Sequence, residues 1–418
     1  MKNIRSQFLQ LNSEVNGHPF TYLDSAATTL KPKCMVDRFA HYLQYEVSNV
    51  HRGAHFYSNQ ATQNYENTRN EVARFLNSKP EEILFTMGTT DSINLVAQSL
   101  PGLTLKRNLE MDSFNISSDH FKNRNEIVLT EMEHHSNIVP WYLVAKKYGF
   151  TIKTIPFNSD GDLDLTSIDE ILTEKTLMVS IVHMSNVFGT MNPIEAIIKK
   201  AKSVGSLTFL DAAQSVSYLP LDVQKLDCDF LTFSAHKLFG PEGLGLLYGR
   251  FDLLEKLDVY RGGGSMISKV SFDDITFLPP PQKFEAGTPN IGAVIAFSES
   301  LKFFTSLSFD DIQKHEDMLL KRCLEGLAVY PGFLPLGAVK NKKNILSFNF
   351  KGLHPSDMGS IIDQMGVAIR VGHHCTQPLM NKMDVTASMR ASFSIYNTVE
   401  DCDRFINAVK KAMELLND

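Results

Sequence analysis

Residues 206–245 read SLTFLDAAQSVSYLPLDVQKLDCDFLTFSAHKLFGPEGLG, and this stretch decides the fold. Two short apolar runs, residues 207–210 and 230–233, predict buried strands, and each run ends in polar residues. The same alternation of short apolar runs with amphipathic stretches extends over residues 60–250. It predicts an α/β fold with a mainly parallel central sheet and helices on both faces. In such a sheet, ligands gather beyond the carboxyl ends of the strands.

The other elements of this region follow from the same periodicities. We expect further strands over residues 82–86, 126–130, 151–155 and 177–182, and helices over residues 91–99, 138–148 and 193–203. Residues 101–125 interrupt the alternation with a long polar stretch, which predicts a mobile surface insertion without assigned chemistry.

A second region begins near Thr288-Pro289, where threonine suits a helix N-cap and proline the first helical position. We expect a helix over 292–307, a strand over 344–350, a helix from Ser356 to Gly366, a strand over 367–371 and a last helix capped by Thr398. The expected domains are a large α/β domain over 21–287 and a smaller α+β domain over 288–418, with residues 1–20 packed against the smaller one.

Composition limits the class of protein. The chain has 418 residues, of which 43% are apolar and 21% charged, as in globular proteins. No apolar run reaches the ~18 residues that a membrane span needs. The N-terminus shows no signal-peptide pattern. A net charge of −6 argues against nucleic acid or a membrane as partner. Five cysteines without C-x-x-C spacing disfavour a disulfide framework and a four-thiolate metal site, and indicate a reducing, cytoplasmic compartment.

Polar residues follow the two strands of the opening stretch. Lys237, with Ser234 and His236 before it, could be an amine that forms an imine beside an anion site. From this motif alone, a surface lysine in a loop is an equally good interpretation. Asp211 ends an apolar strand, where a carboxylate needs a cation such as a protonated pyridine nitrogen; the alternative is a cap of the following helix. Gln214 could lie on the same side and reach the ring's phenolic oxygen.

Two further motifs contain candidate ligand-binding residues. Thr89 and Thr90 of MGTTDSIN stand at a predicted helix start, where free N–H groups and hydroxyls hold phosphate. The alternative is that threonine is an ordinary helix cap there. In EMEHHSNIVPW, His134 or His135 could stack on an aromatic cofactor, whereas a joint metal site is disfavoured and a structural histidine is the commoner case. No G-x-G-x-x-G or Walker A pattern is present.

The last motif, IRVGHHCTQPLM, contains a candidate nucleophile. Cys375 follows two histidines, with Arg370 close by, and positive charge and imidazole make a thiol a better nucleophile. An inert buried cysteine is the usual alternative. A zinc cluster of residues 373–375 is disfavoured because three consecutive ligands give poor tetrahedral geometry.

Together the motifs resemble, in order and spacing, the fold-type I pyridoxal phosphate enzymes of the class V aminotransferase group, and specifically the SufS-type (group II) cysteine desulfurases. The resemblance covers nearly the whole chain. Its motifs are YLDSAATT (22–29), VHRGAHFYSNQAT (50–62), EMEHHSNIVPW (131–141), HMSNVFGT (183–190), LDAAQS (210–215), DCDFLTFSAHKLFGPEG (227–243), RGGGSMI (261–267), FEAGTPN (284–290), RVGHHCTQPLM (370–380) and MRASFSIYNT (389–398).

The resemblance implies a pyridoxal phosphate-dependent transferase fold of type I, with the cofactor in the large domain and the nucleophilic cysteine in the small one. Lys237 is implied to be the Schiff-base lysine, and His134 to stack on the ring. Asp211 is the implied partner of the pyridine nitrogen, and Gln214 that of the phenolic oxygen. The implied phosphate cup consists of Thr90, Ser234 and His236, completed by Thr288 of a neighbouring subunit, which requires a homodimer. Thr89 is also expected to contact the cofactor.

The resemblance also implies the reaction, in which L-cysteine gives L-alanine and a persulfide on Cys375. Lys237, released from the cofactor, is implied to take the proton from the substrate Cα. The implied groups for the substrate are Arg390 as carboxylate anchor, with Asn186, His51, Arg52 and Arg370 nearby. Asn186 is also expected to contact the cofactor.

The persulfide sulfur would pass to an acceptor protein for iron–sulfur cluster assembly. Serine at position 356, where SufU-dependent members carry a second histidine, favours a SufE-like acceptor over a zinc-bearing SufU-like one. The sequence departs from the family at Thr376 and Ala235. A selenocysteine lyase would use the same groups and need Cys375 less. Another class V lyase or aminotransferase would leave residues 373–375 without a role, and an inactive scaffold would not need Lys237, Asp211 and Cys375.

Overall fold

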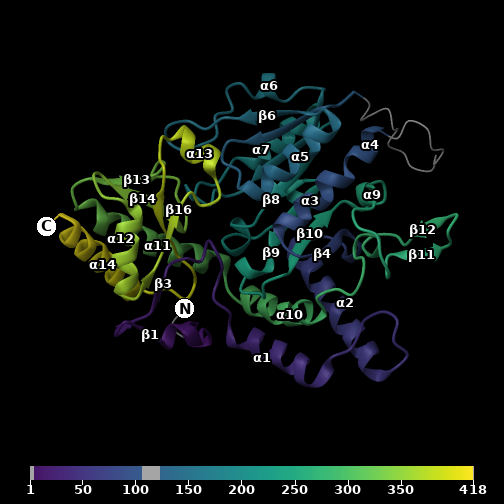
Figure 1. Cartoon of the computed structure of the whole chain (residues 1–418), viewed down its shortest axis with the longest axis horizontal. Coiled ribbons are helices and arrows are strands. Elements are labelled where there is room, and N and C mark those ends of the chain that lie inside the picture. The colour runs from purple at the N-terminus through teal and green to yellow at the C-terminus, as the bar shows by residue number, and fades with distance from the viewer. Residues whose placement is uncertain (1–3, 106–122, 418) are drawn as a thin grey trace.

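The computed structural model describes residues 4–105 and 123–417. A seven-stranded sheet with helices on both faces forms one half of the molecule, and a four-stranded sheet with its own helices lies beside it (Figure 1). This arrangement confirms the predicted α/β fold with a mainly parallel central sheet. Most of the expected insertion, residues 106–122, lies outside the described residues; its first residues form α4 (Pro101–Leu105).

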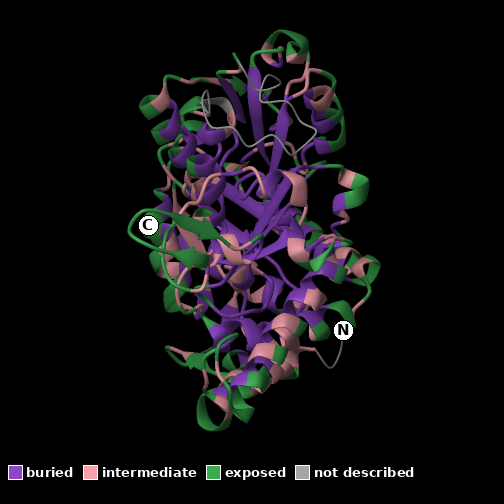
Figure 2. Ribbon diagram, turned by 90° about the vertical axis from the view of Figure 1, so that its right-hand side faces the viewer, coloured by how far each residue is buried: buried purple, intermediate pink, exposed green. Residues whose placement is uncertain are grey.

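The seven-stranded sheet has the order β4-β10-β9-β8-β7-β5-β6. All neighbours are parallel except β10, which is antiparallel to both β4 and β9. Its strands are β4 (Ile83–Thr86), β5 (Glu126–Thr130), β6 (Thr151–Ile155), β7 (Thr176–Val182), β8 (Leu207–Asp211), β9 (Phe230–Ser234) and β10 (Gly245–Gly249). Every residue of these strands is buried except the first four of the edge strand β6, as expected of a sheet covered on both faces (Figure 2).

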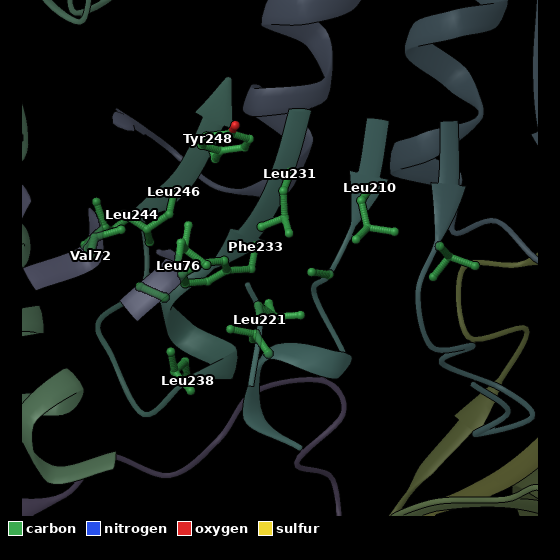
Figure 3. Packing of buried hydrophobic residues seen from close by; sticks show 14 of the residues in the cluster. Val72, Leu76, Leu210, Leu221, Leu231, Phe233, Leu238, Leu244, Leu246 and Tyr248 are labelled. Carbon is green, nitrogen blue, oxygen red and sulfur yellow. The ribbon is translucent and has the colours of Figure 1, made fainter. Parts of the chain in front are cut away.

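Alternate residues of the strands point into two different cores. Leu231 and Phe233 pack with Val72 and Leu76 of α2 on one face (Figure 3), whereas Phe230 packs with Trp141 of α5 on the other. The longer helices that accompany this sheet are α1 (Lys33–His41), α2 (Phe56–Leu76), α3 (Thr89–Ser99), α5 (Val139–Tyr148), α7 (Ile194–Ser203) and α10 (Ile291–Thr305). Short helices are α6 (Ile168–Ile171), α8 (Val223–Leu226) and α9 (Phe251–Leu254).

The four-stranded antiparallel sheet has the order β13-β14-β17-β16 and a separate hydrophobic core. Its strands are β13 (Phe333–Pro335), β14 (Ile345–Phe350), β16 (Arg370–Gly372) and β17 (Ser388–Ser392). The accompanying helices are α11 (Phe309–Ala328), α12 (Pro355–Gln364), α13 (Gln377–Lys382) and α14 (Val399–Asn417).

Several expected boundaries differ from the structure by one or two residues, and two of the differences have a clear structural cause. The helix α10 begins at Ile291 because Asn290, and not Thr288, accepts the N–H of Ala293 at its start. The strand expected over 367–371 is divided: β15 (Val367–Ala368) pairs with β3 (Thr21–Tyr22), and β16 pairs with β17. The expected starts and ends of β5 and β6 are confirmed to the residue.

The N-terminal segment contacts residues of both halves. Arg5 forms an ion pair with Asp401 at the start of α14, and the Phe8 ring packs against Phe239 and Phe303. A short hairpin, β1 (Glu14–Val15) with β2 (His18–Pro19), follows it, and a second, β11 (Ile267–Val270) with β12 (Ile275–Phe277), projects from the seven-stranded sheet (Figure 1). Among the described helices, none combines the length and apolarity that crossing a bilayer requires. The domain boundaries at residues 20 and 287 stay a prediction.

Candidate active site

A cavity of about 190 Å³ opens where the carboxyl ends of β7, β8 and β9 meet the four-stranded sheet. This is the edge at which a parallel sheet offers its loops to ligands. Twelve of the fifteen residues that the sequence singled out line it: Thr89, Thr90, His134, Asn186, Asp211, Gln214, Ser234, His236, Lys237, Arg370, Cys375 and Arg390. Strands, loops and helix ends that are far apart in the sequence therefore form one site.

Asp211 and Lys237 supply an acid and an amine to this cavity. Asp211 ends β8, is 3% exposed, and accepts the N–H of Ala213 at 2.9 Å. It does not cap the following helix, which begins at Ser215 without a side-chain cap. Burial raises the pKa of Asp211, which Lys237 opposes. Burial lowers the pKa of Lys237 to about 8; Asp211 acts in the opposite direction, and the neighbouring Arg390 and Arg370 lower the pKa further. The amine can therefore lose its proton much closer to neutral pH than an ordinary lysine.

Hydroxyl groups gather at the start of α3. Gly88 precedes the helix with φ 150°, a conformation that favours glycine, and the Thr89 N–H donates to Ser234 Oγ at 2.9 Å. Thr90 Oγ1 and Ser136 Oγ are 2.7 Å apart. Free N–H groups and hydroxyls at a helix N-terminus bind phosphate. Ser136 was missed in the sequence, although it belongs to the EMEHHSNIVPW motif.

His134 is held as a neutral ring. Its Nδ1 accepts the N–H of Ser136 at 3.1 Å, and burial, with the positive charge of Lys237 next in importance, lowers its pKa to about 3. The neighbouring Glu133 is buried and accepts hydrogen bonds from the Thr130 hydroxyl, the Asn137 amide and the Val182 N–H. These bonds tie the loop to β5 and β7, so the position of His134 is well determined. A neutral imidazole at a cavity wall can stack on an aromatic ring.

His236 and Gln214 complete this end of the cavity. Burial, then the charge of Lys237, lowers the pKa of His236 to about 4, so its ring is neutral too. The Gln214 side chain donates to the carbonyl of Ala26 at 2.8 Å, which leaves its amide oxygen and second N–H for other partners.

Two arginines at the other end form an anion site. Arg370 of β16 and Arg390 of β17 are directly opposite each other in the antiparallel ladder, so the two side chains are on one face. Arg390 is 1% exposed and forms a 3.1 Å ion pair with Asp24 and a 3.0 Å hydrogen bond to the Asn186 carbonyl. Two adjacent guanidinium groups repel each other and attract a carboxylate. Asp24 was missed in the sequence, although YLDSAATT contains it.

The Cys375 thiol points to the same cavity from a constrained loop. Both His374 and Cys375 have positive φ, 52° and 58°, which non-glycine residues rarely adopt. The Asn186 side chain donates to the His374 carbonyl at 2.7 Å, and Arg370 Nη2 is 3.6 Å from Cys375 Sγ.

Neighbouring residues fix this loop. The His374 ring is hydrogen-bonded to Ser388 at 2.9 Å, and burial lowers its pKa to about 2, so it stays neutral. The Thr376 hydroxyl donates to the His373 carbonyl at 2.9 Å. His374 was not among the expected site residues, although it directly precedes the nucleophile. Among residues 4–105 and 123–417, no group of three or more histidine, cysteine or acidic side chains is arranged to hold a metal ion.

Three expected residues lie outside the cavity. Thr288, His51 and Arg52 are exposed, and the His51 ring is hydrogen-bonded to Glu66 at 2.9 Å. A single chain therefore does not bring them to Lys237. Their roles stay predictions.

The cavity fits pyridoxal phosphate. Asp211 is a buried acid that can pair with a protonated ring nitrogen, and Lys237 Nζ has no hydrogen-bond partner within the part of the chain that the structure describes. The hydroxyls at the start of α3 suit the phosphate, and His134 offers a ring face. Bound pyridoxal phosphate supplies an aldehyde carbon that links covalently to an amine and a ring that withdraws electrons from the linked substrate.

Comparisons with known proteins agree with this geometry. The profile of the Aminotransferase class-V family matches residues 21–405. A cysteine desulfurase of Pectobacterium atrosepticum is 41% identical over 418 residues, covering 100% of this chain and 98% of the relative. A probable cysteine desulfurase of Halalkalibacterium halodurans is 42% identical over 412 residues, covering 98% of this chain and 97% of the relative.

Solved structures of cysteine desulfurases also superpose closely on this chain. The cysteine desulfurase CsdA of Escherichia coli superposes with a TM-score of 0.88 at 36% identity, covering 99% of this chain and 98% of that one. The apo cysteine desulfurase of Thermococcus onnurineus NA1 gives a TM-score of 0.90 at 34% identity, with the same coverage of the two chains.

Proposed function

Because the chain belongs to the class V aminotransferase family, we propose that the cavity around Lys237 removes sulfur from L-cysteine and that Cys375 receives it. The enzyme is a pyridoxal phosphate-dependent cysteine desulfurase, and relatives that match nearly its whole length are named cysteine desulfurase or probable cysteine desulfurase. The products are L-alanine and a persulfide on Cys375, whose sulfur feeds iron–sulfur cluster assembly.

The side chains divide the work. Arg390, helped by Arg370, binds the substrate carboxylate. Lys237 holds the cofactor before substrate arrives and, once released, takes the proton from the substrate Cα, for which its lowered pKa suits it. Asp211 stabilises positive charge on the ring nitrogen, and neutral His134 supports the ring face.

Cys375 completes the reaction as a thiolate. Its Sγ attacks the sulfur of L-cysteine and forms the S–S bond while the substrate Cβ–S bond breaks. The electron pair of that bond stays on Cβ, which takes up a proton to give the methyl group of alanine. Cysteine plus the Cys375 thiol therefore yields alanine plus the Cys375 persulfide, and no oxidant or reductant is consumed.

One observation carries the proposal: Cys375 Sγ lies beside Arg370 at the cavity that Lys237 also lines. The test incubates holoenzyme with L-cysteine, measures alanine, and maps the added sulfur atom by peptide mass. Cys375→Ala should lose both alanine and the persulfide, and Lys237→Ala should lose the yellow cofactor band. Cys34→Ser is the matched control, because Cys34 lies in α1 away from the cavity. A Cys375→Ala enzyme with full cysteine activity would contradict the proposal.

The same experiments separate the alternatives. A Cys375→Ala enzyme that still converts L-selenocysteine but not L-cysteine would favour a selenocysteine lyase. Formation of a new amino acid from alanine and a keto acid would indicate an aminotransferase. A protein that stays colourless after addition of pyridoxal phosphate would favour a scaffold.

We further propose that the enzyme is a SufS-type homodimer in which Thr288, His51 and Arg52 reach the neighbouring subunit's cavity. Their exposure and their position outside the chain's own cavity support this arrangement. The domain division proposed with it places residues 21–287 around the cofactor and 288–418 around the nucleophile, with 1–20 packed against the latter.

The sulfur acceptor proposed here is a SufE-like protein and not a SufU-like one, and the proposed compartment is the cytoplasm. Serine at position 356 and five free cysteines support these two points. A several-fold stimulation of alanine formation by a SufE-like acceptor is the expected result, and no stimulation would count against it.

A further inference from the structure

The helix α13 starts two residues after Cys375 and is not capped by its own N-cap residue. Thr376 occupies the N-cap position, but its hydroxyl donates to the His373 carbonyl at 2.9 Å and accepts no N–H from the helix. The first helical N–H, that of Gln377, instead donates to Nε2 of His135 at 3.0 Å. A side chain more than 200 positions earlier therefore takes the place of the cap.

The same residue also contacts the nucleophile's backbone. The His135 N–H donates to the Cys375 carbonyl at 2.7 Å. His135 thus holds the chain on both sides of Thr376. At the far end of α13, Lys382 forms an ion pair with Glu131 of the same segment. The segment 131–135 therefore holds α13 at its start and at its end.

This segment also contains His134, which lines the cavity on the side expected to face the cofactor ring. Nε2 of its neighbour His135 must carry no proton in order to accept the Gln377 N–H. Burial and the nearby His373 lower the pKa of His135, so the neutral form is the dominant one near neutral pH. Two adjacent histidines consequently link the cofactor's surroundings to the nucleophile loop.

We propose that His135 is a positioning residue: by accepting the Gln377 N–H, its imidazole fixes the start of α13 and holds Cys375 where its thiol can reach the substrate sulfur. The inference rests on the proposed role of Cys375. Two consecutive residues with positive φ make the loop strained, so an external hold is required to keep it in one conformation. Loss of the hold should slow sulfur transfer without changing the cofactor's own site.

The test compares two replacements of His135 in the holoenzyme. His135→Phe keeps a ring of similar size but offers no acceptor, whereas His135→Gln offers a side-chain oxygen that can accept the Gln377 N–H. Single-turnover persulfide formation on Cys375 should fall about tenfold in His135→Phe and recover to within about threefold of wild type in His135→Gln. In both variants the cofactor absorbance and its change on mixing with L-cysteine should match wild type.

A second measurement follows the loop directly. Alkylation of Cys375 by iodoacetamide, mapped by peptide mass, should be several-fold faster in His135→Phe and unchanged in His135→Gln. His373→Gln is the matched control. The His373 side chain is exposed, and this substitution removes an imidazole from the same loop but leaves the His135 ring, which accepts the Gln377 N–H, in place. It should behave as wild type in both measurements.

The outcomes separate the two proposals. Equal persulfide rates in His135→Phe and His135→Gln, or loss of the cofactor signal in both, would overturn the role of His135. Undiminished alanine formation in Cys375→Ser would instead overturn the proposed role of Cys375, and the His135 assignment with it.

Discussion

Lys237 of the cofactor-free enzyme should lose its proton near pH 8. Burial lowers its pKa from 10.5 to about 8. At pH 7 an amine of pKa 8 is neutral in about 9% of molecules, against about 0.03% for an amine of pKa 10.5, so the nucleophilic form is about 300-fold more abundant. The rate of covalent attachment to the cofactor aldehyde should follow this fraction, since only the neutral amine attacks.

The assay mixes cofactor-free enzyme with pyridoxal phosphate between about pH 6 and 10 and records how fast the yellow band develops. The wild-type rate should rise with a midpoint close to 8. Because Asp211 raises the pKa of Lys237 and Arg370 lowers it, Asp211→Asn should move the midpoint down and Arg370→Met should move it up, each by about one unit. Lys237→Ala should develop no band.

The opposite directions make the experiment decisive. A general loosening of the cavity in either variant would admit water and move both midpoints upward, toward that of an exposed lysine. A wild-type midpoint near 10, or shifts of the same sign in the two variants, would show that burial and these two charges do not control the amine.

Two other predictions concern the ring face and the core. His134→Phe keeps an aromatic face, so its affinity for pyridoxal phosphate in equilibrium dialysis should be within about threefold of that of wild type. His134→Ala should bind pyridoxal phosphate about tenfold more weakly, and equal affinities of the two variants would rule out stacking. Glu285→Ala leaves the 2%-exposed Arg69 side chain without its bidentate carboxylate and should lower the free energy of unfolding in urea by about 3 kcal/mol. Asp37→Ala, which breaks an exposed pair with Lys33, should change it by less than about 0.5 kcal/mol, and equal losses in both would refute this assignment.

Local patterns predicted the fold and much of the site. Strands β5 and β6 are short apolar or alternating runs ended by turn residues, so their limits follow from neighbouring residues alone. Asp211 and Lys237 follow strands that are neighbours in a parallel sheet, and the carboxyl ends of such strands meet at one edge. Simple topology therefore brings them together, and the sequence was sufficient to predict it.

Long-range pairings were beyond local patterns. The strand expected over 367–371 is divided because its first residues pair with β3, about 345 positions earlier. Asp24 and Ser136 contribute through contacts with Arg390 and Thr90, which depend on the arrangement of distant elements. The start of α10 was misplaced because asparagine, threonine and proline are all adjacent there, and only the observed bond from Ala293 selects Asn290.

One residue, Asn186, connects Arg390 at one end of the cavity with the loop that contains Cys375. Asn186 lies in the loop after β7, its carbonyl accepts a hydrogen bond from Arg390, and its side chain donates to the carbonyl of His374. The proposed anchor of the substrate carboxylate, Arg390, and the loop that contains Cys375 are thus both hydrogen-bonded to one residue in a loop of the seven-stranded sheet. Arg390 lies in β17 of the four-stranded sheet, and Cys375 lies in the loop after β16 of the same sheet. A shift of that sheet would therefore move both groups together relative to Lys237. Asn186 opposes such a shift at two points, so a contact between the two halves of the molecule holds Arg390 and Cys375 in place relative to Lys237.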